Sequence, residues 1–155
     1  MGLRIREVTA DNWKAIAALS VDESQKEFIE SNLFSLAQSK FEPQWKSVGL
    51  YDADVLVGYA MYGRDQSTGR VWLDRFMIDL QFQGQGYASR FLPGLLAAIQ
   101  QHYDCDVIYL SVYPENARAQ HVYEKFGFEL NGEIDKAGLV HGLVMKLDVQ
   151  ERRTS

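Results

Sequence analysis

Gly84 and Gly86 stand one residue apart, between a strand-like run from Leu73 to Asp79 and a helix with an apolar face. Glycine has no Cβ, so the backbone at such a junction can turn sharply and approach a ligand closely. The first N–H groups of the following helix have no partner within the helix and point toward a bound anion. These residue types at this spacing predict a binding site for a pyrophosphate.

Three kinds of glycine-rich nucleotide loop differ in spacing, and they can be compared with this one. A Walker loop needs Gly-Lys-Ser/Thr, but Gly86 is followed by Tyr87 and Ala88. A dinucleotide fingerprint needs a third glycine where Ser89 stands, and no βαβ unit precedes the loop. The stretch Gln83-Gly84-Gln85-Gly86-Tyr87-Ala88 does fit a third pattern, Gln/Arg-x-x-Gly-x-Gly/Ala.

A second block of spaced residues lies in the last third of the chain. Asn116, Ala119, Tyr123 and Gly127-Phe128 follow the pattern Asn-x-x-Ala-x-x-x-Tyr-x-x-x-Gly-Phe. Together with the glycine loop, this block resembles the GNAT family of N-acetyltransferases, and the resemblance extends from Leu3 to Leu147. In that family the glycine loop holds the pyrophosphate of acetyl-coenzyme A.

The elements that must position these motifs begin with a strand and two helices. Residues 3–8 alternate like a half-buried strand, and Trp13 and Ile16 mark a short helix after it. A second helix, from about Glu23 to Ser39, is expected to bury Ile29, Leu33 and Leu36 at helical spacing. Segments 48–51, 55–62 and 71–79 are separated by turns and predict an antiparallel meander at the centre of a sheet.

The glycine loop is followed by a helix, a strand, a shorter helix and a hairpin. An apolar stripe from Ala88 to Ile99 predicts the first helix, in which Pro93 should cause a kink or irregular first turns. Strand 107–113, helix 116–126 and hairpin 128–147 complete the order β-α-α-β-β-β-α-β-α-β-β. This is the order of the GNAT fold, an α/β (α+β) fold with a mixed central sheet of about seven strands and helices on both faces.

The resemblance also implies roles for single residues. Tyr123 matches the tyrosine that faces the thioester sulfur, and backbone groups of strand 76–78 would pair with the pantetheine arm. The residues placed against the coenzyme are Phe76, Met77, Ile78, Gln83, Gly84, Gln85, Gly86, Tyr87, Ala88, Ser89 and Asn116. Spacing leaves two alternatives open: Tyr123 shares a helical stripe typical of buried core, and Asn116 is a favoured helix cap.

The chemistry that the resemblance implies is direct transfer of acetyl from coenzyme A to an amine through a tetrahedral intermediate. An alkyl ammonium has a pKa of about 10.4, so presenting the neutral amine at pH 7 costs about 4–5 kcal/mol. Asp74 is our candidate for the group that removes the proton, and an ion pair with Arg75 or Arg70 is the alternative. Tyr123 would serve the leaving sulfur as a hydrogen-bond donor or stabiliser.

Acidic and aromatic residues indicate what kind of amine would accept the acetyl group. Glu23, Glu27 and Glu30 share one face of the second helix, which borders the acceptor groove in this fold, although a solvated face has the same pattern. Segments 48–51, 58–63 and 69–79 resemble bacterial spermine/spermidine acetyltransferases more closely. Glu23, Glu27 and Asp74 would then bind a polyamine by charge, and Tyr62 and Trp72 by cation–π contact. The alternatives are another acceptor (an amino acid, an aminoglycoside or a protein N-terminus) and a non-catalytic acyl-coenzyme A sensor.

Composition sets outer bounds on these hypotheses. The 155 residues suit one domain, residues 1–147, and the charged segment 148–155 is expected to fray. A net charge of −5 argues against nucleic-acid binding and suits a small cationic substrate. One cysteine and three scattered histidines predict no metal site, and without a membrane-length apolar run or a signal peptide we expect the cytoplasm. Dimers are common in the family, so a homodimer is a further expectation.

Overall fold

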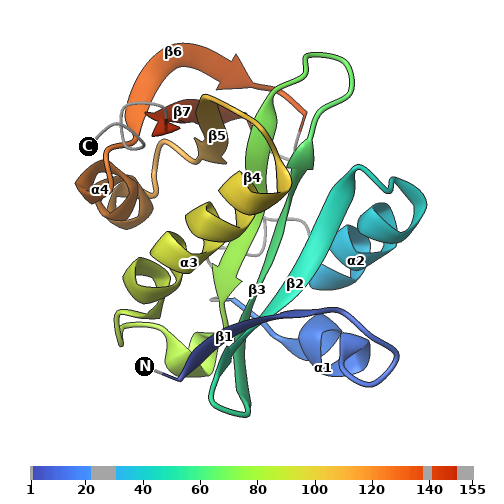
Figure 1. The fold of residues 1–155 in the computed structure, drawn as a ribbon. Coiled ribbons are helices and arrows are strands. Elements are labelled where there is room, and N and C mark those ends of the chain that lie inside the picture. Colours follow the sequence, from blue (N-terminus) through green and yellow to red (C-terminus); the bar gives the residue numbers. More distant parts are fainter. Residues whose placement is uncertain (1, 22–30, 138–140, 150–155) are drawn as a thin grey trace.

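The computed structural model describes residues 2–21, 31–137 and 141–149, which form one mixed sheet with helices on both of its faces (Figure 1). The strand order is β1-β2-β3-β4-β5-β7-β6. The strands are β1 (Leu3–Glu7), β2 (Trp45–Asp52), β3 (Val55–Arg64), β4 (Val71–Ile78), β5 (Val107–Val112), β6 (Glu129–Asp135) and β7 (Gly142–Asp148). The helices are α1 (Trp13–Ala18), α2 (Asn32–Phe41), α3 (Tyr87–His102) and α4 (Ala117–Lys125), with a short 3₁₀ turn at Leu80–Phe82. The predicted order of strands and α-helices is confirmed.

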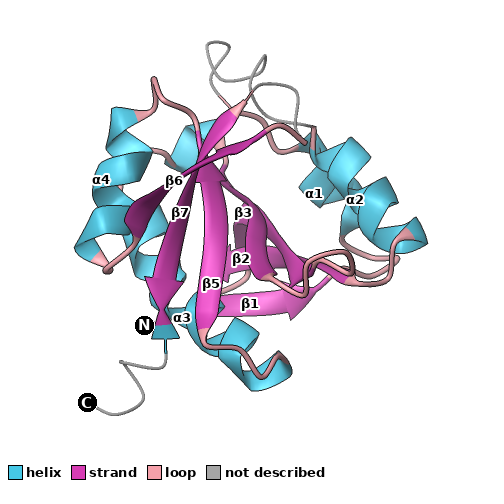
Figure 2. Cartoon of the chain, turned by 90° about the horizontal axis from the view of Figure 1, so that it is seen from above, coloured by secondary structure: helices cyan, strands magenta, loops and turns pink. Residues whose placement is uncertain are grey.

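The described residues form two hydrophobic clusters. Figure 2 shows that the helices above them lie on different sides of the sheet, α3 and α4 on one side and α1 and α2 on the other. The larger cluster packs the stripe of α3, centred on Phe91, Leu95 and Ile99, and the inner side of α4 against the sheet. The smaller cluster lies under α1 and α2 and contains Ile16, Tyr59 and Met77. Burial of large apolar side chains contributes about 1.5–3 kcal/mol each, so these clusters fix which face every strand residue presents.

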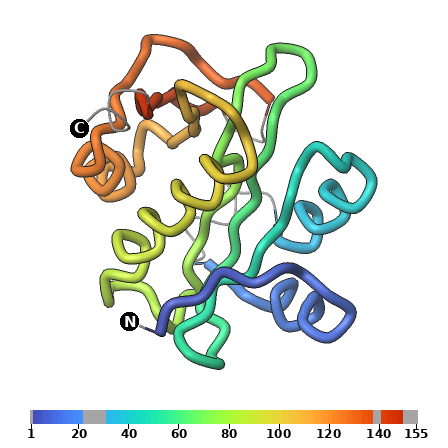
Figure 3. The backbone as a smooth tube through the Cα atoms, in the orientation of Figure 1, coloured from blue at the N-terminus to red at the C-terminus, as the bar shows by residue number. Residues whose placement is uncertain are grey.

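Strands β4 and β5 are parallel neighbours that separate soon after they meet. Among the described residues they pair only at Val71↔Ile108 and Trp72↔Tyr109. From Asp74 onward, β4 therefore has one edge paired with β3 and one edge turned toward the opening between the two strands. Figure 3 shows the chain leaving the far end of β4 and entering α3 through the glycine loop. The split of the sheet and the glycine loop thus border the same space.

Helix α2 packs on the sheet partly through polar residues, so the predicted apolar stripe is wrong at Leu33, whereas Leu36 packs against the smaller cluster as predicted. Leu33 is 57% exposed, whereas Asn32 and Ser35 are buried. The reason is the surface beneath the helix, where Arg75 donates to Ser35 and Ser47 hydrogen-bonds Ser39. Ile29, Glu23, Glu27 and Glu30 lie outside the described residues.

Two further expectations about chain segments needed correction. Asp148 pairs with Val107 in the sheet, and Val149 is completely buried and donates its N–H to the Asp106 carbonyl, so these two residues do not fray. Helix α3 begins at Tyr87 and continues through Pro93, so its first turns are not irregular, and a kink at Pro93 stays a prediction. A fixed φ of about −65° is itself helical, and only one N–H is lost. None of the helices in the described part of the chain combines the length and apolar character that a membrane crossing requires.

Candidate active site

The glycine loop has the backbone geometry that its spacing predicts. Gly84 has φ +81° and Gly86 has φ +80°, a left-handed conformation that side chains with a Cβ rarely adopt. Apart from their chain neighbours, no atom of the described residues lies within 4 Å of where a Cβ would stand at either glycine, so both positions face open space. Gly86 is the N-cap of α3 and offers no capping side chain. The first N–H groups of this 16-residue helix therefore point out of the loop, as a bound pyrophosphate requires.

The two glutamines of the loop support it from within. The Gln83 side chain donates a hydrogen bond of 3.0 Å to the Ile78 carbonyl, which ties the loop to the end of β4. The Gln85 side chain donates to the Gln81 carbonyl at 3.4 Å. Gln83 lines the cavity over the loop, and Gln85 is not among the residues that line it. Both side chains thus brace the loop, and the coenzyme contact that the resemblance implies for them stays a prediction.

Two cavities meet at the split between β4 and β5. One, of about 380 Å³, lies over the glycine loop and is lined by Gly84, Gly86, Tyr87, Ala88 and Ser89. The other, of about 300 Å³, lies beside β2, β3 and α2. The residues that line both cavities are Phe76, Met77, Asn116, Ala119 and Tyr123. The structure therefore brings the two sequence motifs together at one junction.

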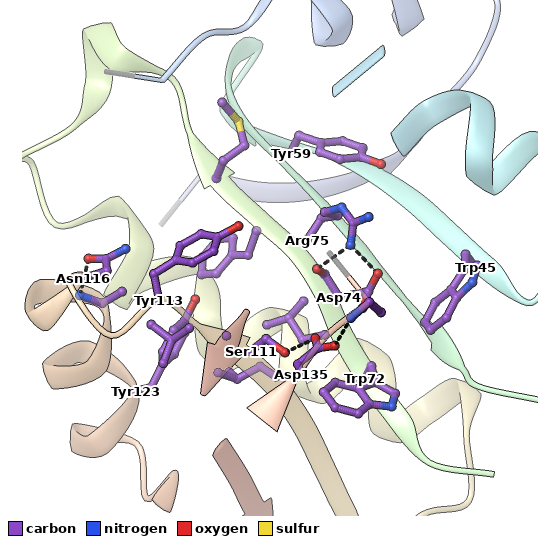
Figure 4. A pocket seen from close by; sticks show the side chains of 18 of the residues that line it. Trp45, Tyr59, Trp72, Asp74, Arg75, Ser111, Tyr113, Asn116, Tyr123 and Asp135 are labelled. Atoms are coloured by element: carbon purple, nitrogen blue, oxygen red, sulfur yellow. Dashed lines mark hydrogen bonds and ion pairs between the residues drawn. The ribbon is translucent and has the colours of Figure 1, made fainter. Parts of the chain in front are cut away.

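The two roles considered for Asn116, helix cap and coenzyme contact, are compatible in the structure. Its side-chain oxygen accepts a hydrogen bond of 3.1 Å from the Ala119 N–H, so it caps α4. Its side chain also borders both cavities, at the wall from which Tyr113 and Tyr123 project (Figure 4). The cap fixes the start of α4 and, with it, the position of Tyr123 two turns later.

The Tyr123 hydroxyl lies at the junction of the cavities. Its ring packs edge to face on Phe128, with ring centroids 5.8 Å apart, so the core holds the side chain in place. Although the residue is only partly buried, its hydroxyl is desolvated, which raises the pKa of Tyr123 to about 12. Within residues 2–21, 31–137 and 141–149 no group forms a hydrogen bond with this hydroxyl. Tyr123 is thus both a core residue and a neutral donor that a ligand can use.

A β-bulge places Asp74 in the second cavity. Met61 pairs with Arg75 and Tyr62 pairs with Leu73, so Asp74 is the extra residue of β4. Leu73 and Phe76 pack in the cluster under α3, and the bulge turns both Asp74 and Arg75 toward the opposite face. Their side chains form an ion pair of 2.5 Å. The alternative that paired Asp74 with Arg75 is confirmed, whereas Arg70 pairs with Glu133 at 2.8 Å.

The aromatic residues of the second cavity are partly those expected. Trp72 lines it and packs against Tyr109, with ring centroids 5.4 Å apart. Tyr62 does not line it, and this prediction is wrong. Tyr62 is 1% exposed and belongs to the cluster under α3, because residues 60 and 62 of β3 face that side while residues 59 and 61 face α2. Tyr59 takes the place that Tyr62 was expected to occupy.

Two carboxylates and one indole of this cavity were missed from the sequence. Asp135, at the end of β6, lies beside Asp74 and Trp72 in Figure 4 and accepts a hydrogen bond from Ser111. Asp65 and Trp45 complete the acidic and aromatic lining. The sequence carries no local signal for Asp135, because it reaches this cavity through strand pairing across about sixty residues.

Comparison with known proteins decides the family. The model of the acetyltransferase (GNAT) family matches residues 11–128. The chain belongs to the GNAT family. It is 42% identical over 144 residues to the spermine/spermidine N(1)-acetyltransferase of Bacillus subtilis strain 168, with 89% of this chain and 95% of that protein covered. A probable spermine N(1)-acetyltransferase of Bacillus subtilis subsp. natto matches to the same extent.

Solved structures of the GNAT fold confirm the predicted architecture. The spermidine N-acetyltransferase of Vibrio cholerae in complex with CoA and spermine superimposes with a TM-score of 0.78 at 20% identity, covering 99% of each chain. The ribosomal-protein-S18-alanine N-acetyltransferase of Escherichia coli gives a TM-score of 0.70 at 18% identity, covering 95% of this chain and 94% of that one. Enzymes with quite different acceptors therefore share this GNAT fold, and the acceptor must be argued from the cavity.

Proposed function

We propose that the protein transfers the acetyl group of acetyl-coenzyme A to a primary amine of a polyamine such as spermidine or spermine. The observation that carries the proposal is the composition of the cavity beside Tyr123. It combines three carboxylates, Asp65, Asp74 and Asp135, with the indoles of Trp45 and Trp72. Carboxylates bind ammonium groups by charge-assisted hydrogen bonds, and indole faces attract cations. The names of the Bacillus relatives support the same acceptor.

The residues of the first cavity fit acetyl-coenzyme A, which supplies the acetyl group as an activated thioester. The N–H groups at the start of α3 and the open backbone at Gly84 and Gly86 would bind its pyrophosphate. The edge of β4 that is not paired with β5, at residues 76–78, would hydrogen-bond the pantetheine arm as a further strand does. Phe76 and Met77 line both cavities, so the arm would lead to the junction.

Asp74 and Tyr123 divide the proton chemistry in this proposal. The acceptor ammonium must lose a proton before it attacks, and Asp74 receives it directly or through water. Tyr123 donates a hydrogen bond to the sulfur as negative charge develops there. Because its pKa is about 12 and that of a thiol about 8.5, complete proton transfer would cost about 5 kcal/mol. Tyr123 therefore acts as a hydrogen-bond donor and keeps its proton. Coenzyme A then leaves as the thiolate when the C–S bond breaks, and the second proton of the nitrogen passes to water as the amide forms.

An acceptor panel tests the proposal. Purified protein is incubated with acetyl-coenzyme A and one amine at a time, and release of the free thiol is followed. We expect turnover with spermidine and spermine at a kcat/KM well above that with lysine, an aminoglycoside or a peptide N-terminus. Turnover of other amines only would support the broader N-acetyltransferase alternative. Acetyl-coenzyme A binding without turnover would support the sensor alternative, and each of these outcomes contradicts a polyamine acceptor.

Several expectations remain predictions beside this proposal. Glu23 and Glu27 lie outside the described residues, and we propose that they extend the acidic side of the acceptor groove. The single catalytic domain, the cytoplasmic placement and the homodimer likewise stay proposals. Their tests are the activity of a variant truncated after Val149 for the domain, fractionation for the compartment and light scattering for the dimer.

A further inference from the structure

The interface between α2 and the sheet contains a chain of buried hydroxyl groups. Ser39 donates to the Leu36 carbonyl at 3.0 Å, Ser39 and Ser47 are 2.7 Å apart, and Ser47 and the Tyr59 hydroxyl are 2.6 Å apart. Ser47 and Tyr59 are 8% and 0% exposed. Buried hydroxyls are costly unless they are hydrogen-bonded, so this chain determines how α2 sits on the sheet.

The direction of each hydrogen bond in this series of hydroxyl groups follows from the Leu36 carbonyl at its end. A carbonyl can only accept, so Ser39 uses its one proton on Leu36, Ser47 must donate to Ser39, and Tyr59 must donate to Ser47. In this series the protons therefore point from Tyr59 toward Leu36. Elsewhere on α2, the Ser35 oxygen accepts from Arg75 Nε at 3.2 Å, since a guanidinium can only donate.

Arg75 is held on three sides by this arrangement. Nε donates to Ser35, Nη2 donates to the Gln38 side chain at 3.3 Å, and Nη1 donates to the Asp74 carboxylate at 2.5 Å. Nη1 also lies 3.1 Å from the Asp74 carbonyl. The side chains of Arg75 and Asp74 are 16% and 23% exposed, so solvent screens the pair only in part. A planar guanidinium with fixed partners on α2 leaves its carboxylate partner little freedom to rotate.

We propose that Arg75 is a positioning residue, which holds the Asp74 carboxylate in its productive orientation and couples that orientation to the seating of α2. The inference rests on the proposed function, because it assumes that Asp74 acts on the acceptor amine. Asp74 and Arg75 are consecutive residues and can still form this pair, because the β-bulge turns both side chains to the same face of the sheet. If the ion pair were purely structural, Arg75 would contribute to stability, and its removal would not change what Asp74 does in the reaction.

The test is a double-mutant cycle with acetyl-transfer kinetics. Arg75→Ala, Asp74→Asn and the double variant are compared with wild type, using the acceptor that wild type acetylates best. We expect Arg75→Ala to lower kcat/KM for the amine at least about tenfold and to leave the Kd for acetyl-coenzyme A within about twofold. We expect the double variant to be no slower than Asp74→Asn, because Arg75 acts through Asp74. Losses that multiply in the double variant would overturn the proposal.

Rescue by a small molecule gives a readout that stability alone does not change. Millimolar methylguanidinium should restore part of the activity of Arg75→Ala and none of the activity of the double variant. Arg6→Ala, which removes the arginine of another arginine–aspartate pair (Arg6–Asp54, 3.3 Å), should keep wild-type kinetics and not respond to the additive. Arg75→Lys keeps one cation, which cannot hold Asp74, Ser35 and Gln38 together, and should lose less activity than Arg75→Ala.

The outcomes separate this inference from the proposed function. No rescue of a folded Arg75→Ala that still binds acetyl-coenzyme A, or full activity in Asp74→Asn, overturns the positioning role. Neither result touches the acceptor, which the wild-type panel determines. Absence of polyamine turnover in wild type overturns the proposed function and leaves the cycle measurable with whichever amine is acetylated.

Discussion

Replacing Tyr123 by phenylalanine should separate turnover from stability. The substitution removes one hydroxyl that is desolvated and forms no hydrogen bond within the described part of the chain. A hydrogen bond to a charged group contributes about 1.5–3 kcal/mol. The sulfur acquires negative charge only during the reaction. The variant should therefore lose this stabilisation of the transition state, whereas its binding free energy for acetyl-coenzyme A should not change. The expected loss in kcat is about ten- to 150-fold.

The stability of the same variant should change in the opposite direction. A buried hydroxyl without a partner destabilises the folded state, so its removal should leave the free energy of unfolding unchanged or raise it by up to about 1 kcal/mol. The ring remains packed on Phe128. A control is Tyr62→Phe, which removes the hydroxyl of a tyrosine that is 1% exposed and lines neither cavity. That variant should keep wild-type kcat.

The assay combines three measurements on wild type, Tyr123→Phe and Tyr62→Phe. Thiol release gives kcat, isothermal titration gives the Kd for acetyl-coenzyme A, and urea unfolding gives stability. We expect only kcat of Tyr123→Phe to fall. Unchanged kcat in Tyr123→Phe, or a Kd that rises by the same factor as kcat falls, would refute the role of the hydroxyl at the sulfur.

Three further predictions follow from the geometry. Gly86→Ala should lower stability by about 1 kcal/mol, because φ is +80°, and weaken acetyl-coenzyme A binding; Gly69→Ala, at φ +76° in equally open space, should lower stability alone. Burial raises the pKa of Tyr59 to about 12 from 10.0, so above about pH 10 the unfolded state loses a proton that the folded state keeps, and stability falls as pH rises toward 12. Urea unfolding at about pH 9 and about pH 11 should show a loss about 1 kcal/mol larger in wild type than in Tyr59→Phe, and equal losses would contradict the assignment. Asp135→Asn should raise the KM for spermidine roughly fivefold and leave that for a monoamine unchanged in steady-state assays; equal effects would exclude a second ammonium contact.

Local patterns predicted the parts of the site that depend on one segment of chain. The glycine spacing gave the left-handed turns at Gly84 and Gly86, and the helical stripe gave the buried face of α3. The Asn116 motif gave both the cap of α4 and the placement of Tyr123. Each of these features is specified within about two helical turns, where residue type and backbone conformation are directly linked.

The acceptor side depends on contacts that no short window contains. A single extra residue in β4 turns Arg75 toward the cavity, although simple alternation would place it on the face opposite Asp74. The prediction for Tyr62 placed it on the wrong face of the sheet, and the packing of α3 decides that face. Helix α2 buries Asn32 and Ser35 and leaves Leu33, Phe34 and Phe41 exposed, because Arg75 and Ser47 supply polar partners beneath it. Such interactions are properties of the assembled sheet.

A competition experiment tests the central claim most directly. Wild-type protein with limiting acetyl-coenzyme A is given equimolar spermidine, lysine, an aminoglycoside and a peptide with a free N-terminus, and the acetylated products are quantified by mass spectrometry. Because the amines compete for one enzyme, the product ratios equal the ratios of kcat/KM. The carboxylate and indole lining of the cavity predicts that monoacetylated spermidine dominates. A different dominant product, or no acetylated amine from protein that binds acetyl-coenzyme A, would contradict the account.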